Sequence, residues 1–360
     1  MRIEAWSVAP VTHRNLDPEW HYAGRDVPEL LGVRVALRAG DRMGEGYAPF
    51  LPHLDTTPEV LETTACSIAA GLLAADLSDL DACVARLGPC SRARNAARSA
   101  AEMALLDLAA RGAGASVAAM LGGAPRAVEV LRIIPVKSPV RMADIAGSLV
   151  AEGYRALKLK GTGDHEADIA RIAAVRGAVG AGITLTVDAN QAYDTCGALR
   201  LERALRPHDI WSLEQPVPAN DRASLATVRQ QSHARIEADE GLFDADDLDA
   251  VLTAEAADGI SLKLARSGGL LPSRDMALRG AGRGVYARLG TAFGGPLVTL
   301  ATATLAALCP TKGPAECAEF AHFDDGDHLW PTVRDGLLIP QKGPGFGQIR
   351  QSPWLAEWTG

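Results

Sequence analysis

Lysine and carboxylate residues recur at nearly even intervals through the middle of the chain. Lys160, Asp188, Glu214, Asp239 and Lys263 are separated by 28, 26, 25 and 24 residues in turn, and each ends a short apolar run. One polar residue at such a position commonly marks only the point where a strand meets solvent. Five in a row, at the spacing of one strand plus one helix, predict a single shared site.

Three of these residues are carboxylates that would lie on neighbouring strands. Asp188, Glu214 and Asp239 offer hard oxygen ligands, and three monodentate carboxylates leave three octahedral positions for water and substrate. That arrangement suits magnesium better than a soft metal, so we predict one Mg²⁺ per subunit. Asn190 follows Asp188 and Glu240 follows Asp239, and both are predicted to orient these ligands without binding the metal themselves.

Two lysines end one run, and a third lysine ends a later run. The two-residue period of a strand places Lys158 and Lys160 on one face, where we expect their like charges to lower a lysine pKa toward the range of a general base. Lys263, four strands further on, is predicted to lie across the site from Lys160. Two bases beside a divalent cation suit removal of the proton alpha to a carboxylate, because the cation stabilises the resulting enediolate.

Short β-type runs alternate with alanine-rich helical stretches from about residue 128 onward. The runs expected as strands are 128–136, 156–160, 184–188, 211–214, 236–239, 260–263, 285–289 and 315–320. Eight strands with intervening helices predict a parallel TIM-type barrel, whose catalytic groups lie at the carboxyl ends of its strands.

The first third of the chain has a different pattern, with strands and helices that do not alternate. We expect strands over 2–9 and 31–37, a turn at Gly40 and Asp41, and helices over 58–75 and 96–111. The last thirty residues are rich in Gly, Pro and Trp. We predict an α+β capping domain at 1–122, a barrel domain at 123–330 and a tail at 331–360 that returns to the capping domain.

Composition and charge exclude several classes of protein. A formal charge of -8 offers no broad basic surface for nucleic acid or an anionic membrane. The six cysteines form no C-x-x-C pair, which favours buried free thiols over a zinc site. No stretch of 18 apolar residues and no signal peptide is evident, so we expect a cytoplasmic, soluble protein.

These residues resemble the enolase superfamily, and the Lys158-Leu159-Lys160 motif with the lone Lys263 is similar to its muconate lactonizing enzyme subgroup. Gly268-Gly269 and Pro344-Gly345-Phe346-Gly347 extend the resemblance along the chain. It implies a modified (β/α)7β barrel with an α+β cap. It also implies that Lys160 and Lys263 are the acid/base catalysts, that the three carboxylates bind magnesium, and that Lys158 contacts the substrate carboxylate.

Two segments depart from the pattern of this subgroup. After strand seven, Phe293-Gly294-Gly295-Pro296 is similar to the Trp-Gly-Gly-Asp segment of members that act on hydroxyproline, its betaine or related proline derivatives, with Phe for Trp and Pro for Asp. The run Asp324-Asp325-Gly326-Asp327 is distantly similar to the paired aspartates with which dipeptide epimerases hold an ammonium group. A solvated acidic loop is the alternative for that run.

Aromatic residues cluster where the first domain would cover the barrel. Trp20 and Tyr22 lie between the first two predicted strands and Tyr47 follows the second, while Phe293 and Gly294 follow strand seven. We predict that these five residues help to bind substrate, since aromatic faces attract a cationic nitrogen. The alternative is that the aromatic side chains pack the two domains together.

The function that these features favour is a magnesium-dependent racemase or epimerase of an amino-acid-like carboxylate that is proline-derived, N-substituted or a dipeptide. One lysine would remove the proton and the other would return it from the opposite face. A hydroxyproline-type dehydratase and a muconate-type cycloisomerase stay open as alternatives, as does a non-catalytic carboxylate-binding paralogue. We expect a homo-oligomer whose partner is a small carboxylate.

Overall fold

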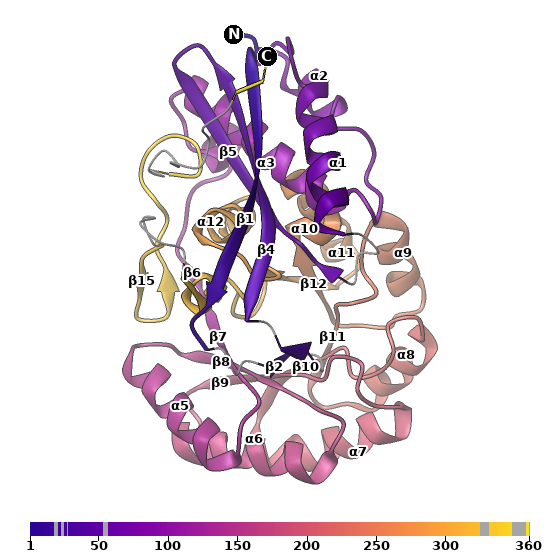
Figure 1. Ribbon diagram of the computed structural model, residues 1–360. Helices are drawn as coiled ribbons and strands as arrows, with labels where there is room; N and C mark the ends of the chain where they lie inside the picture. The colour runs from indigo at the N-terminus through magenta and orange to yellow at the C-terminus, as the bar shows by residue number, and fades with distance from the viewer. Residues whose placement is uncertain are drawn as a thin grey trace.

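A parallel sheet curls around the centre of the larger domain, and a separate antiparallel sheet covers one end of it (Figure 1). The structure is a computed structural model and describes residues 1–17, 21–22, 25–26, 28–52, 57–324, 331–347 and 358–359. No helix within these ranges is long and apolar enough to cross a lipid bilayer.

The curled sheet has seven parallel strands in sequential order. They are β7 (Leu131–Ile134), β8 (Ala156–Lys160), β9 (Thr184–Asp188), β10 (Ile210–Glu214), β11 (Arg235–Ala238), β12 (Gly259–Lys263) and β13 (Tyr286–Gly290). A short eighth segment joins the two edges, because Ala315 bridges Val130 beside β7 and Glu316 bridges Gly290 of β13. The sheet is thereby closed into a barrel.

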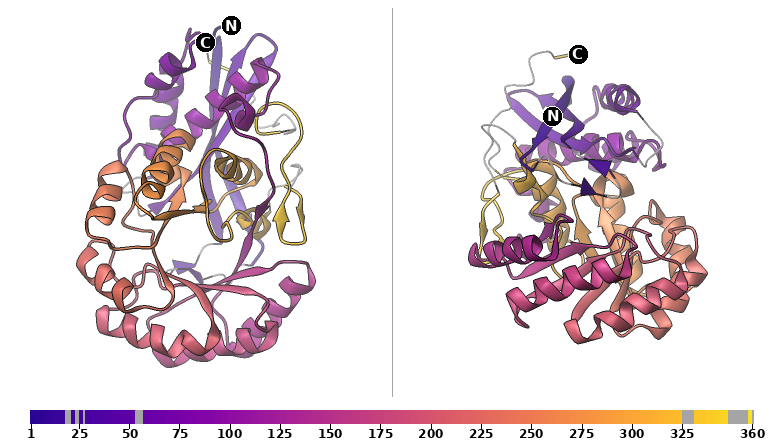
Figure 2. Two further views of the ribbon diagram at one scale, coloured as in Figure 1. Left: turned by 180° about the vertical axis from the view of Figure 1, so that it is seen from behind. Right: turned by 60° about the horizontal axis from the view of Figure 1, so that its bottom comes forward.

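Helices connect successive barrel strands and surround them (Figure 2). They are α5 (Pro139–Ala151), α6 (His165–Val179), α7 (Thr195–Leu205), α8 (Arg222–Gln231), α9 (Ala245–Thr253), α10 (Leu264–Ser267), α11 (Leu270–Ala281) and α12 (Pro296–Thr304), with 3-10 turns η2 (Arg206–His208), η3 (Leu305–Ala307) and η4 (Glu319–His322). From α5 to α9, each helix begins at a Ser or Asp whose side chain accepts a hydrogen bond from the first turn. These caps fix where each connection ends and its helix starts.

The covering domain combines an antiparallel sheet with four helices. Its elements are β1 (Ala5–Asn15), β4 (Glu29–Ala39), β5 (Arg42–Pro49) and β14 (Phe323–Asp324), in the order β14-β1-β4-β5, with α1 (Pro58–Gly71), α2 (Leu80–Ala85), α3 (Asn95–Gly112), α4 (Val117–Met120) and the small pair β2 (His21–Tyr22) and β3 (Arg25–Asp26). The predicted turn at Gly40 and Asp41 joins β4 to β5.

Helix α3 lies directly against the backbone of β5. A Cβ atom at Gly46 would approach the carbonyl oxygen of Ala100 to 1.8 Å, and one at Gly44 would approach that of Ala104 to 2.3 Å. Only glycine permits this approach, so the two glycines set the position of α3. The helix is buried along almost its whole length.

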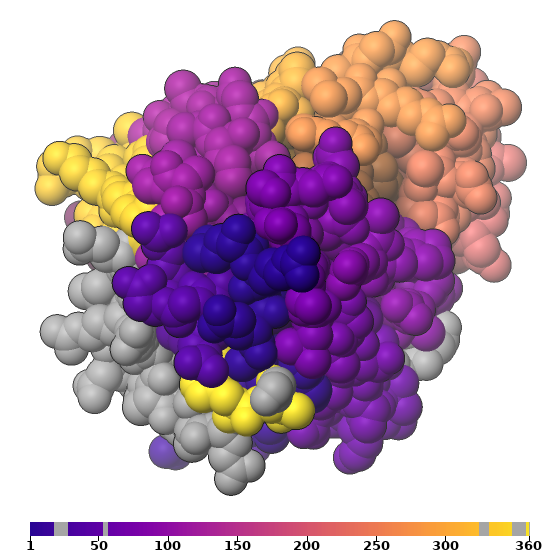
Figure 3. Space-filling view, turned by 90° about the horizontal axis from the view of Figure 1, so that it is seen from above, coloured from indigo at the N-terminus to yellow at the C-terminus, as the bar shows by residue number. Residues whose placement is uncertain are grey.

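The tail contacts both domains. Strand β15 (Val333–Arg334) pairs with β16 (Leu337–Leu338), which in turn pairs with β6 (Val128–Glu129) beside the barrel. Further along, the carbonyl oxygen of Gly345 accepts a hydrogen bond from Val117 of α4 at 2.9 Å, and Thr359 bridges Trp6 of β1. Seen from above, this last segment lies beside the N-terminal strands (Figure 3).

The predicted fold class, a modified TIM-type barrel with an α+β cap, is confirmed, and the expected strands from 156–160 to 285–289 agree with the structure within about one residue at each end. Two expectations were wrong. Residues 42–49 form the strand β5, which was missed, and the strand expected over 315–320 pairs only at Ala315 and Glu316 before the chain turns into η4. The domain limits at 122 and 330 stay a prediction.

Candidate active site

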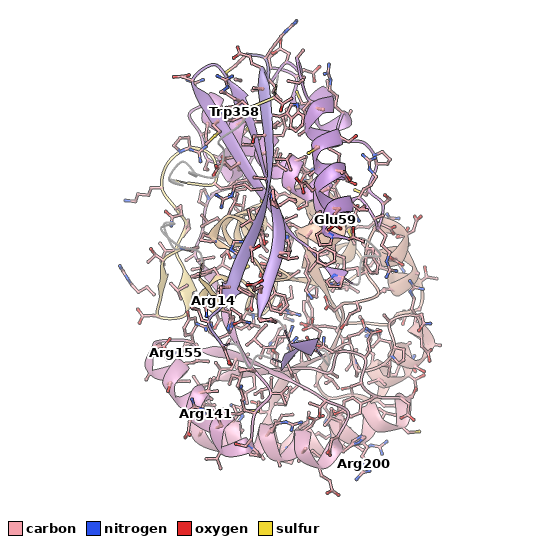
Figure 4. All side chains as sticks on the ribbon, viewed as in Figure 1. Arg14, Glu59, Arg141, Arg155, Arg200 and Trp358 are labelled. Atoms are coloured by element: carbon pink, nitrogen blue, oxygen red, sulfur yellow. The ribbon has the colours of Figure 1, made fainter. Side chains whose placement is uncertain are left out.

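The charged strand ends converge on one side of the barrel. Lys160 of β8 lies in register with Asp188 of β9, which in turn lies in register with Glu214 of β10. Asp239 follows β11 directly, and Lys263 ends β12. All five side chains are buried, in contrast to the exposed arginines Arg141, Arg155 and Arg200 at the outer edge of the barrel domain (Figure 4).

Lys158 lies at the centre of the charged residues, where its side chain is 1% exposed. Its Nζ atom is 3.1 Å from an oxygen of Asp188 and 2.7 Å from an oxygen of Glu214, and it also donates to Glu316. One ammonium group therefore lies within reach of carboxylates from three strands.

The other two lysines each pair with a different carboxylate. The Nζ atom of Lys160 is 2.7 Å from Asp188 Oδ2, and that of Lys263 is 2.6 Å from Asp239 Oδ2. Strands β9, β10 and β11 lie between the strands that carry these two lysines. The two ammonium groups thus approach the strand ends from separate positions on the barrel wall.

The expected lowering of the pKa by like charges does not hold for Lys158 in the metal-free site. Burial lowers the pKa of Lys158, but Asp188, Glu214 and Glu316 outweigh burial and hold it well above its usual value. Burial also lowers the pKa of Lys263, but Asp239 raises it by more, so the pKa lies above its usual value. The prediction considered the neighbouring lysine and not the carboxylates that face it.

The pKa values of the buried carboxyl groups shift in different directions. Burial raises the pKa of Asp188, but Lys158 and Lys160 more than offset it, so the pKa is lowered. The pKa of Asp239 is also low, because Arg266 and Lys263 outweigh its burial. Glu214 differs: burial and the neighbouring Asp188 raise its pKa to about 7 although Arg288 acts against them.

Five charged residues of this site were missed in the sequence: Arg266, Arg288, Glu237, Glu316 and Glu319. Arg266 follows Lys263 closely and donates to Asp239, while Arg288 of β13 lies 2.5 Å from Glu214 and 2.7 Å from Glu237. Glu316 accepts from Lys158, and Glu319 lies buried beyond it. A charge inside an apolar run was the available signal, because Arg288 and Glu316 interrupt stretches that were expected to be buried strands.

Carboxyl groups outnumber cations around the strand ends. Five cations face seven carboxylates, all buried or nearly so: Lys158, Lys160, Lys263, Arg266 and Arg288 against Asp188, Glu214, Glu237, Asp239, Glu240, Glu316 and Glu319. Oε2 of Glu214 forms ion pairs with Lys158 at 2.7 Å and with Arg288 at 2.5 Å, whereas Oε1 has no hydrogen-bond partner among the described residues. The carboxylates offer the hard oxygen donors that magnesium prefers.

The carboxylates are not gathered around a metal position in this arrangement. Among the described residues, no three Asp, Glu, His or Cys side chains stand together in the geometry of a metal site. The physical reason is that Lys158, Lys160, Lys263 and two arginines bind the carboxylate oxygens. Metal binding would therefore require these side chains to exchange partners, and the ligand roles stay a prediction.

The two residues predicted to support the ligands contact each other. Asn190 donates from Nδ2 to Glu240 at 3.0 Å, and its backbone N–H donates to Asp188 at 3.0 Å. Burial, together with Asp239 and Asp188, raises the pKa of Glu240 to about 7. Asn190 thus links the strand end of Asp188 to the loop that follows Asp239.

The predicted substrate-binding residues fall into two groups. Tyr47 is 2% exposed and packs against His13 and the Gly294 backbone, so it joins the two domains. The ring of Phe293 packs against Leu131, Ile133 and Ala156 inside the barrel and lies edge-on to Phe323. Trp20, the Tyr22 side chain, the Asp324 side chain and residues 325–327 lie outside the described part of the structure.

A family model, described as enolase C-terminal domain-like, matches residues 141–349 of the chain. Among the relatives, an L-Lys-D/L-Arg epimerase of Methylococcus capsulatus is 32% identical over 353 residues, which cover 94% of this chain and 96% of the relative. The match therefore spans both the cap and the barrel.

Solved structures agree with this relationship. A dipeptide epimerase of Methylococcus capsulatus, complexed with Mg and the dipeptide L-Arg-D-Lys, has a TM-score of 0.90 and 28% identity, covering 97% of this chain and all of the other. A muconate lactonizing enzyme of Pseudomonas fluorescens, complexed with muconolactone, also has a TM-score of 0.90 and 28% identity, covering 97% of this chain and 96% of the other.

Proposed function

Since the chain belongs to the mandelate racemase and muconate lactonizing enzyme family of the enolase superfamily, we propose that it inverts the α-carbon of an amino-acid-like carboxylate. The chain is an enzyme of this superfamily, whose members among its relatives are epimerases, racemases and cycloisomerases. The choice of epimerisation is supported by the site and by the relatives that cover most of the chain.

The observation that carries this proposal is the placement of the two lysines. Lys160 and Lys263 end strands separated by three others, and each has its own carboxylate partner. A base on each side of the substrate allows one lysine to remove the α-proton while the other donates a proton to the opposite face. Inversion requires these two positions, whereas proton exchange with retention requires only one.

Asp188, Glu214 and Asp239 are proposed to hold Mg²⁺, which their hard oxygen donors on three neighbouring strands support. When bound, the cation would neutralise the charge of the substrate carboxylate. It would also compete with the lysines for the carboxylates that raise the lysine pKa values, and a lower lysine pKa favours the neutral amine that a base requires. Lys158 is proposed to hold the substrate carboxylate, because its ammonium already lies among carboxylate oxygens at 2.7 and 3.1 Å.

The substrate class that we propose is a dipeptide or an N-substituted amino acid, and proline derivatives are a narrower possibility within it. The named activities of two relatives, an L-Lys-D/L-Arg epimerase and an N-succinyl-L-Arg/Lys racemase, support this class. The buried Glu316, whose pKa Lys158 and Lys263 hold low despite its burial, adds a negative charge on the side of the eighth strand segment. That charge favours a substrate that carries a cationic group.

A test of this function follows the α-proton of candidate substrates in heavy water with Mg²⁺. L-Lys-L-Arg, L-Ala-L-Glu, N-succinyl-L-lysine and hydroxyproline betaine form a suitable panel, and nuclear magnetic resonance reports both deuterium incorporation and the diastereomer or enantiomer formed. We expect at least one compound to exchange its proton with inversion. Loss of water or ring closure without inversion would instead assign a dehydratase or a cycloisomerase. The double variant Lys160→Ala with Lys263→Ala serves as the inactive control.

A further inference from the structure

A stripe of polar side chains on α3 faces the loops that follow β11 and β12. Asn95, Arg98 and Glu102 lie at positions i, i+3 and i+7, which share one face of a helix. All three are buried. Helix α3 belongs to the cap, lies close to α10 and α11 (Figure 1), and presents its other side to β5.

Arg98 and Glu102 bind the segment after Lys263. Arg98 Nη1 donates to the Gly268 carbonyl oxygen at 2.5 Å and lies 3.2 Å from Glu102. Glu102 accepts hydrogen bonds from the backbone N–H groups of Leu270 and Leu271 at the start of α11. Gly269 has a φ of 139°, and a Cβ there would lie 2.1 Å from Glu102, so a glycine is required at this contact.

Asn95 contacts both loops at once. Its Nδ2 donates to the carbonyl oxygen of Phe243 at 3.2 Å and to that of Arg266 at 2.7 Å, while its Oδ1 accepts from the backbone of Ser91 at 2.8 Å. Phe243 lies four residues after Asp239, and Arg266 lies three residues after Lys263. One amide therefore ties together the loop that begins at Asp239, a predicted metal ligand, and the short helix α10 that follows Lys263, a predicted base.

We propose that Asn95 is a positioning residue, through which the cap holds Asp239 and Lys263 in their working geometry. Lys263 and Arg266 both bind the Asp239 carboxylate, so the two loops form one unit at the strand ends. Lys160 ends β8 and lies outside the two segments that accept the Asn95 hydrogen bonds, so its position depends on Asn95 less directly. The role in proton transfer rests on the proposed function, whereas the role toward Asp239 does not.

The first measurement is the affinity for Mn²⁺, followed by electron paramagnetic resonance. Asn95→Asp keeps the size of the side chain but loses both donated hydrogen bonds, and Asn95→Ser is the second variant if the first does not fold. We expect Mn²⁺ to bind about 10- to 100-fold more weakly, as is usual when a residue supporting a ligand is lost. Leu108→Ala is the control, because Leu108 is buried on the side of α3 that faces β5.

The second measurement is the α-proton exchange of L-Lys-L-Arg and L-Lys-D-Arg in heavy water at saturating Mg²⁺. The epimer whose α-proton still exchanges in Lys160→Ala is the one that Lys263 deprotonates. In Asn95→Asp, exchange of that epimer should fall about 10-fold or more, while exchange of the other changes far less. Leu108→Ala should slow both epimers equally or neither.

The two measurements separate the possible failures. Unchanged Mn²⁺ affinity in the Asn95 variants, or equal slowing of both epimers, would overturn the positioning role. If wild type exchanged neither epimer, the dipeptide function would be contradicted. If Asn95→Asp still weakened Mn²⁺ binding in that case, the role of Asn95 toward Asp239 would be supported.

Discussion

At the residue scale, the candidate site is an assembly of buried charges that depend on one another. Lys158 pairs with carboxylates of three strands, and Asp239 pairs with both Lys263 and Arg266. Removing one partner would leave a buried charge without its counterion, which is more costly than removing both. A single substitution that removes one of these charges is therefore expected to destabilise the fold.

Glu319 allows a test of this charge balance away from the predicted ligands. Burial, with Glu316 nearby, raises the pKa of Glu319 from 4.5 to about 8. Between these values the native state holds a proton that the unfolded state has released, so the free energy of unfolding falls as pH rises through this range. Glu319→Gln keeps the neutral form, and we expect the metal-free variant to be roughly 1 to 3 kcal/mol more stable than wild type above pH 8.

The measurement for Glu319 is urea unfolding of the metal-free protein at pH 5 and pH 8.5. The gain of Glu319→Gln should be large at pH 8.5 and small at pH 5, where wild type also carries the proton. An equal effect at both pH values would mean that this carboxyl is ionised in the native state throughout.

At the scale of elements, the position of α3 depends on its contact with β5. Gly46→Ala places a methyl group 1.8 Å from the Ala100 carbonyl oxygen, which the rigid backbone cannot accommodate. We expect a loss of about 3 kcal/mol or more in the free energy of unfolding, measured by denaturant titration. Gly147→Ala in α5 is the matched control, since nothing lies within 4 Å of its Cβ.

The control variant should be slightly more stable than wild type, by up to about 1 kcal/mol, because alanine favours a helix more than glycine does. If Gly46→Ala behaved like Gly147→Ala, the close packing of α3 on β5 would be incorrect.

Most of the barrel could be predicted from the sequence because its strands and helices alternate regularly. The strands β8 and β9 were predicted to the residue, since a buried apolar run ends there in charge. The eighth segment was not, because its ladder has only two bridges and closure of the barrel rather than a local pattern defines it. The ion pairs of Arg266 and Arg288 join residues far apart in sequence, and no local pattern reveals such partners.

At the scale of the whole molecule, the cap and the barrel meet at the charged strand ends. The stripe of Asn95, Arg98 and Glu102 binds the loops of β11 and β12, and Tyr47 packs against the backbone of Gly294 after β13. Because these contacts lie beside the candidate site, the geometry of that site depends on how the two domains pack. A homo-oligomer and a cytoplasmic location stay predictions.

The buried oxygen donors of Asp188, Glu214 and Asp239 predict that a divalent cation stabilises the entire fold. A cation that binds only the native state adds about 2.7 kcal/mol at a concentration one hundred times its dissociation constant. We expect Mg²⁺ to raise the thermal midpoint, measured by calorimetry, and a chelator to reverse the effect. Asp239→Asn should lose most of the increase, while no response of wild type to Mg²⁺ would contradict the predicted metal site.

The central claim is that two lysines transfer protons to opposite faces of one carbon. The direct measurement is deuterium incorporation in heavy water by Lys160→Ala and Lys263→Ala, each offered both epimers of a substrate that wild type inverts. Each variant should exchange the proton of one epimer only, the two variants should act on opposite epimers, and neither should invert its substrate. A variant that exchanges both epimers, or two variants that choose the same one, would contradict it.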